Sequence, residues 1–127
     1  MSEAALASRW PRWNVQVAGA FGALLVLTGA MGLLRPEPGG LMSQAVPYDI
    51  FHIAFGALGL TVGLRRAPGE SAAFNLGFGL IDLWQVVAGW SGVFPAPLFA
   101  LRPADHVVHL VVGVLLVACG AAGLRRR

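Results

Sequence analysis

Residues 104–124 read ADHVVHLVVGVLLVACGAAGL, an apolar run whose only carboxylate stands near its start. A transmembrane helix needs about 20 predominantly apolar residues to cross a hydrocarbon core roughly 30 Å thick, and this run has that length. Three further runs meet the same criterion, at residues 14–34, 47–64 and 72–90. The sequence therefore predicts four membrane-spanning helices.

The composition excludes an ordinary water-soluble domain. Of the 127 residues, 57% are hydrophobic and 12% are charged, and the mean hydropathy is +0.71. Soluble domains carry about 25% charged residues, so half of the usual charge is missing. We expect a single integral membrane domain over residues 1–127, an all-α four-helix transmembrane bundle whose main partner is the lipid bilayer.

The arginines predict the orientation of the bundle. The chain has nine arginines and no lysine, and basic residues accumulate in cytoplasmic loops. Seven of them would share one side of the membrane and two the other, which predicts cytoplasmic termini in a bacterial inner membrane. Because they flank the apolar runs and cover no single face, nucleic acid is not an expected partner. The seven are Arg9, Arg12, Arg65, Arg66, Arg125, Arg126 and Arg127, and the two are Arg35 and Arg102.

The chain aligns with itself at a shift of 57 residues, which pairs His52 with His109. Each repeat unit contains two of the apolar runs, so both units enter the membrane from the same side. We predict two similar helical hairpins related by a pseudo-twofold axis along the membrane normal. The other pairs are Phe21-Gly22 with Phe78-Gly79, Gly32 with Gly89, Pro38 with Pro95, Leu41 with Leu98, Gly56 with Gly113, Leu58 with Leu115, and Gly63 with Gly120.

Glycines recur at helical spacing on one face of the predicted helices. Lipid provides little hydrophobic drive between helices, so small residues that let two backbones approach closely are the ordinary means of association. We predict that the glycines on these faces mediate helix packing. They are Gly22, Gly56, Gly59, Gly63, Gly113 and Gly120.

Four polar residues lie at similar depth in the outer half of the predicted bundle: His52, Asp82, Gln85 and His109. An ionisable group at the centre of a membrane helix costs about 2.5–3.5 kcal/mol on insertion scales, so each one needs a partner or a function. Asn75 falls on the same helix face as Asp82 and Gln85. We therefore predict a buried polar cluster.

Three other polar residues, Asp49, Asp105 and His106, lie closer to the outer ends of their helices. A carboxylate in the first turn of a helix is stabilised by the helix dipole, by roughly 0.3–1 kcal/mol. We expect the two aspartates to serve at least this role.

The polar cluster admits three interpretations. It is a network of interhelical hydrogen bonds, or a site where His52 and His109 hold a b-type haem or a divalent metal, or a proton or small-solute pathway through Asp82. No nucleotide-binding, hydrolase or metalloprotease motif is present, and Cys119 has no base beside it in sequence. We expect no enzymatic activity and no cofactor, with haem b or a divalent metal as the alternative.

Two segments carry a family resemblance: residues 48–60, YDIFHIAFGALGL, and residues 104–116, ADHVVHLVVGVLL. Over residues 13–124 the chain resembles a bacterial family of small four-span membrane proteins of unknown function. In that family His-Leu-x-x-Gly opens the second span and Asp-Asn-x-x-His-Leu-x-x-Gly opens the fourth. Here Ile53 replaces the first leucine and His106 replaces the asparagine, whereas Asp105, His109, Leu110 and Gly113 fit.

The resemblance implies the fold and the topology, and it implies no activity. A looser similarity to DoxX-type four-helix membrane proteins is the second choice. We expect a small structural or accessory membrane protein, with a homo-oligomer or a larger membrane complex as further partners.

Overall fold

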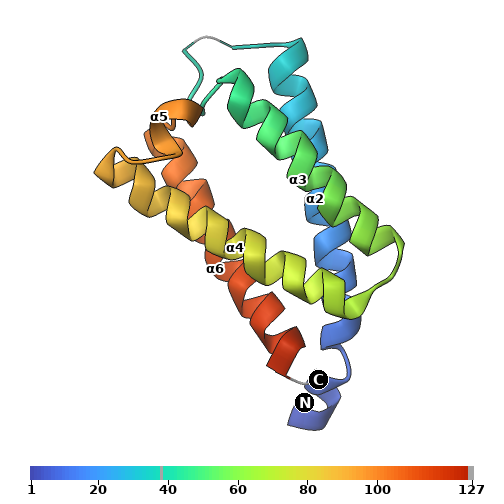
Figure 1. Ribbon diagram of the computed structural model, residues 1–127. Coiled ribbons are helices and arrows are strands. Elements are labelled where there is room, and N and C mark those ends of the chain that lie inside the picture. Colours follow the sequence, from blue (N-terminus) through green and yellow to red (C-terminus); the bar gives the residue numbers. More distant parts are fainter. Residues whose placement is uncertain (38, 126–127) are drawn as a thin grey trace.

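The computed structural model describes residues 1–37 and 39–125, and this part of the chain is all-helical (Figure 1). Four helices are long and apolar enough to cross a membrane, which confirms the predicted all-α fold with four such helices. Pro38, Arg126 and Arg127, which belong to the predicted repeat and to the arginine bias, lie outside the described residues. The helices are α1 (Glu3–Ala7), α2 (Trp10–Leu34), α3 (Val46–Leu64), α4 (Pro68–Ser91), α5 (Ala96–Phe99) and α6 (Pro103–Arg125).

Each of the four long helices has a proline in its first turn: Pro11, Pro47, Pro68 and Pro103. Proline suits this position because its missing N–H would be unpaired there and its φ angle is already helical. The predicted starts at residues 14 and 72 are late, since α2 begins at Trp10 and α4 at Pro68. The hydropathy criterion missed these first turns because they carry polar residues.

Two short helices were also missed. The side chain of Ser2 accepts a hydrogen bond from the backbone of Ala5 at the start of α1, and α5 interrupts the connection between α4 and α6. Both are too short to show the apolar periodicity that predicts a helix.

The long helices form two antiparallel hairpins, with α2 packed along α3 and α4 packed along α6. Figure 1 shows the start of α2 and the end of α6 at one end of the bundle, and the residues that precede α3 and those that precede α6 at the other. We call these the proximal end and the distal end. The side chain of Ser43 bonds to the carbonyl of Phe99, and Arg102 bonds to the carbonyl of Gly40, so the two distal connections are joined.

Close contacts inside the two hairpins repeat at the shift of 57 residues. A β-carbon on Gly22 would collide with the backbone nitrogen of Leu60, and one on Gly79 would lie 2.8 Å from the nitrogen of Val117. A β-carbon on Gly63 would lie 2.5 Å from the Cα of Gly19. In the second hairpin, a β-carbon on Gly120 would collide with the backbone nitrogen of Leu76, and these two residues are the repeat equivalents of Gly63 and Gly19. The hairpins are therefore similar in their packing, as the sequence repeat predicts.

Aromatic rings fill the space between the hairpins. Phe78 on α4 is buried and contacts Phe21 on α2, with ring centroids 5.6 Å apart, and Phe51 on α3, at 5.8 Å. Phe74 stacks on Phe78 one turn closer to the proximal end, at 5.7 Å. On α4 these phenylalanines precede Asp82 and Gln85, so they lie on the proximal side of the predicted polar cluster.

Candidate functional site

Asp105 is the centre of a hydrogen-bond network at the distal end. Its carboxylate is fully buried, and Oδ2 accepts hydrogen bonds from the backbone nitrogens of Arg102, at 2.8 Å, and Ser43, at 2.9 Å. Oδ1 accepts a bond from the hydroxyl of Tyr48 at 3.3 Å. One first-turn carboxylate therefore caps α6 and also ties it to α3 and to the connection before α3.

Tyr48 joins this network to both predicted histidines. Its hydroxyl lies 2.7 Å from Nε2 of His109, and its ring packs on the imidazole of His52 with centroids 4.1 Å apart. His52 and His109 are 6% and 4% exposed. The structure thus brings the two repeat-related histidines to one tyrosine, which the sequence analysis did not select as a site residue. We call Asp105, Tyr48 and His109 the distal network.

Tyr48 was missed although the sequence contains a signal for it. Tyr48 and Asp105 occupy equivalent positions in the two repeat units, 57 residues apart. Residues that lie near a pseudo-twofold axis can meet their own repeat equivalents. A search for polar residues paired by the shift, whatever their type, would have selected this pair.

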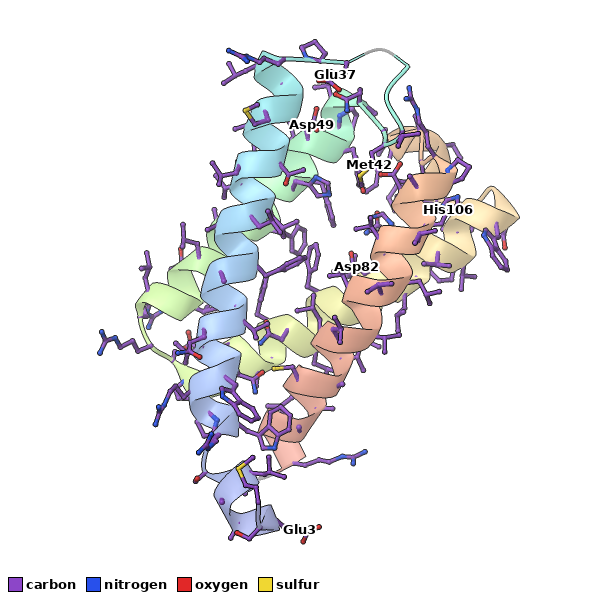
Figure 2. All side chains as sticks on the ribbon, turned by 180° about the vertical axis from the view of Figure 1, so that it is seen from behind. Glu3, Glu37, Met42, Asp49, Asp82 and His106 are labelled. Atoms are coloured by element: carbon purple, nitrogen blue, oxygen red, sulfur yellow. The ribbon has the colours of Figure 1, made fainter. Side chains whose placement is uncertain are left out.

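Asp82 and Gln85 lie beside each other on α4, as predicted. Asp82 is 3% exposed, and Figure 2 shows it midway along the bundle, between the hairpins. Gln85 is fully buried, and its Nε2 donates to Oδ1 of Asp82 over a long 3.4 Å. Neither residue has a hydrogen bond to the distal network among the described residues.

Asn75 is buried on α4 like Asp82 and Gln85, but its hydrogen-bond partner lies elsewhere. Its side-chain nitrogen donates to Oδ1 of Asn14 on α2, at 2.9 Å. Asn14 in turn donates to the carbonyl of Cys119 at 3.0 Å, and the Cys119 thiol lies 3.5 Å from Oδ1 of Asn14. This proximal cluster links α2, α4 and α6, and the sequence reasoning missed Asn14 as its centre.

Asp49 and His106 are repeat equivalents that occupy equivalent places. The carboxylate of Asp49 packs against Gly32, and the imidazole of His106 packs against Gly89. Each glycine leaves room that a β-carbon would fill. Asp49 Oδ2 and His106 Nδ1 are buried and have no hydrogen-bond partner within the described chain. Neither side chain reaches the distal network.

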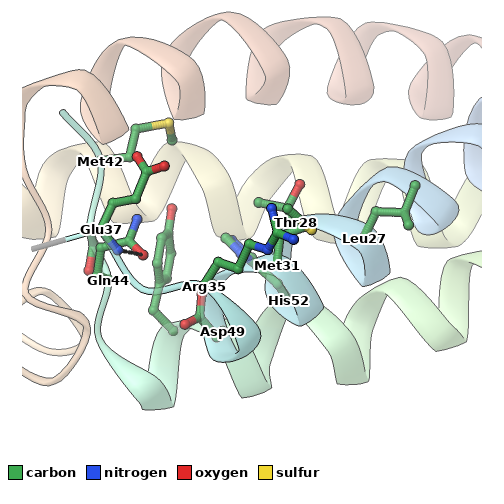
Figure 3. Close-up of a pocket in the computed structure, with 12 residues that line it drawn as sticks. Leu27, Thr28, Met31, Arg35, Glu37, Met42, Gln44, Asp49 and His52 are labelled. Carbon is green, nitrogen blue, oxygen red and sulfur yellow. Dashed lines mark hydrogen bonds between the residues drawn. The ribbon is translucent and has the colours of Figure 1, made fainter. Parts of the chain in front are cut away.

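Two cavities meet at Tyr48 and His52. The distal cavity, of about 470 Å³, includes Arg35, Glu37 and Asp49 in its lining (Figure 3). The central cavity, of about 200 Å³, lies deeper and includes Asp82 and His109. Both share Thr28, Met42, Tyr48 and His52.

The geometry does not suit a haem held by the two histidines. Nε2 of His109 is bonded to the Tyr48 hydroxyl, and the Tyr48 ring lies against His52, where a porphyrin would have to enter. Among residues 1–37 and 39–125, no three histidine, cysteine or acidic side chains converge as metal ligands. What the described residues do offer is a central cavity lined by Asp82 and by both histidines, whose Nδ1 atoms are buried and have no hydrogen-bond partner in the described chain.

Comparison with known proteins identifies the family. Residues 39–122 match the family described as Domain of unknown function (DUF4383), which includes α3, α4 and α6 and all residues of the distal network. No curated protein and no solved structure matches the chain. This match confirms the expectation that the chain resembles a family without an assigned function. The quoted family motifs and the similarity to DoxX-type proteins stay predictions. The match extends over more than half of the chain, which therefore belongs to the DUF4383 family.

Proposed function

We propose that this protein is a structural or accessory component of the bacterial inner membrane, without enzymatic activity and without a resident cofactor. The observation that carries the proposal is the distal network, in which one buried carboxylate joins α6, α3 and a connecting segment. Such a network holds two hairpins in a defined arrangement, which is what a stable building block of a membrane assembly requires.

The two ends of the bundle support this proposal in the same way. The proximal cluster links α2, α4 and α6, and the distal network links α3 and α6. Hydrogen bonds across membrane helices contribute on the order of 0.6 kcal/mol each, so several are needed to select one packing. The outward-facing apolar side chains then remain for lipid, for a second copy of the chain or for the other subunits of a larger membrane complex.

The first test replaces Asp105 and measures thermal unfolding in detergent. Asp105→Ala leaves three donors without their acceptor, and hydrogen bonds to charged groups contribute about 1.5–3 kcal/mol each to stability. We expect a clear fall in the melting temperature. Glu70→Ala is the matched control, since Glu70 is also a first-turn acid, in α4, but is exposed and paired only with Arg65 at 3.5 Å.

The melting temperatures of these two variants decide whether the distal network has a structural role. A large loss of stability for Asp105→Ala with little change for Glu70→Ala supports a structural role. If both variants unfold at the wild-type temperature, the distal network does not hold the bundle together and the proposal is wrong.

A further inference from the structure

The central cavity contains a buried carboxylate without a counter-charge. Asp82 lines the cavity, and its one hydrogen bond in the described chain is the 3.4 Å contact from Gln85. The described residues form a single ion pair, between Arg65 and Glu70. No arginine lines this cavity. A buried ionised carboxylate is costly unless it is paired, so this site favours a cation.

His109, which lines the same cavity as Asp82, offers a hydrogen-bond acceptor as well. An ionised carboxylate can only accept, so the single hydroxyl proton of Tyr48 goes to Asp105. The short contact between Tyr48 and His109 then requires that Nε2 of His109 donates to the tyrosine oxygen. We assign this tautomer from the hydrogen-bond network. It leaves Nδ1 of His109 as a bare lone pair, buried and without a partner.

The rest of the cavity lining is mostly apolar and suits the apolar or aromatic part of a ligand. Phe21, Phe78 and Tyr48 contribute three aromatic rings to the lining, and an apolar or aromatic ligand packs well against such rings. Leu24 on α2 and Val108 on α6 also line the cavity and are exposed on the outside of the bundle, so the cavity reaches the surface that faces lipid. A volume of about 200 Å³ accommodates one ring with a short side chain.

We propose that the central cavity binds a small hydrophobic primary amine in its cationic form, entering from the bilayer between α2 and α6. The ammonium group pairs with Asp82 and donates to Nδ1 of His109, and the aromatic or aliphatic part lies against the phenylalanines. A ligand that offers only acceptors, such as a carbonyl compound, fits less well, because the assigned groups here are themselves acceptors. The site shares Tyr48 and His109 with the distal network, whereas Asp82, which supplies its charge, has no hydrogen bond to that network in the described chain.

The test measures binding of 2-phenylethylamine to the purified full-length protein in lipid nanodiscs, with 2-phenylethanol as its neutral counterpart and empty nanodiscs as the blank. We expect saturable binding of the amine, and binding of the alcohol that is weaker by about tenfold or more, since hydrogen bonds to charged groups exceed neutral ones by that order. Asp82→Asn should weaken amine binding by a similar factor. Glu70→Gln removes an exposed carboxylate on the same helix and should bind like the wild type.

A second variant guards against a folding defect in Asp82→Asn. Thr28 lines the central cavity and is exposed on α2, so Thr28→Trp places bulk at the cavity entrance without entering the packed core. We expect this variant to keep the wild-type melting temperature and to lose amine binding. The proposal is overturned if the amine does not bind saturably, if the alcohol binds as tightly, or if Thr28→Trp and Asp82→Asn both bind the amine like the wild type.

Discussion

At the scale of single residues, burial and hydrogen-bond satisfaction diverge in this protein. The carboxylate of Asp105 accepts hydrogen bonds from three donors, so both of its oxygens are paired. Asp49, at the start of the neighbouring helix, is also buried, yet its Oδ2 has no partner in the described chain. Buried polar atoms in folded proteins are almost always paired, so each unpaired one needs an explanation, such as a bound water or ligand. Two such atoms, Nδ1 of His52 and Nδ1 of His109, belong to side chains that line the central cavity.

Asp82 permits a prediction that separates hydrogen bonding from charge. Asp82→Asn keeps a side chain that can bond to Gln85, whereas Asp82→Leu leaves the buried amide of Gln85 without its partner. An unsatisfied buried group costs about 1–3 kcal/mol, so we expect Asp82→Leu to lower the free energy of unfolding by that much more than Asp82→Asn. Thermal unfolding of both variants in the same detergent measures the difference. Equal stabilities would show that the contact contributes nothing to folding.

At the scale of helices, the glycines decide how close each pair comes. A β-carbon on Gly56 would lie 2.7 Å from the carbonyl oxygen of Gly22, and one on Gly113 would lie 3.1 Å from that of Gly79. These four glycines are two equivalent pairs of the repeat. The predicted packing role is therefore visible in both hairpins, and Gly59 extends it by receiving the ring of Phe74.

A leucine at either packing glycine should force the helices apart. Overpacking costs typically about 1–3 kcal/mol, so we expect Gly56→Leu and Gly113→Leu to lower the melting temperature of the bundle. Gly77→Leu is the matched control, because a β-carbon on this helical glycine meets nothing within 4 Å. That variant should unfold at or above the wild-type temperature, since leucine also has the higher helix propensity. A control as unstable as the two packing variants would contradict the assigned interface.

At the scale of the whole molecule, the bundle has two chemically different ends. The proximal end bears the start of α2, the end of α6 and the connection with Arg65 and Arg66, and the distal end bears the distal network and the distal cavity (Figure 1). The arginine bias of the sequence predicts that the proximal end lies in the cytoplasm. The distal cavity would then open on the exported side of the membrane.

Reporter fusions test this orientation. A fusion after Gly69 should report a cytoplasmic location, and fusions after Gly40 or Pro97 should report export, because loops rich in arginine are retained in the cytoplasm. A reporter pair such as alkaline phosphatase and green fluorescent protein distinguishes the two sides. The opposite pattern at all three positions would reverse the topology and place the distal cavity in the cytoplasm.

The sequence by itself determined the four spans, the pairing into similar hairpins and the burial of His52, Asp82, Gln85 and His109. These properties depend on apolar length and on the cost of exposing a polar group to lipid, and both can be read along the chain. Only the tertiary structure decided which polar groups meet. Asn75 pairs with Asn14, and Tyr48 bonds to both Asp105 and His109, across separations of 57 to 61 residues. Such partners depend on the rotation and register of each helix against its neighbour, which the packed backbones set and no local pattern encodes.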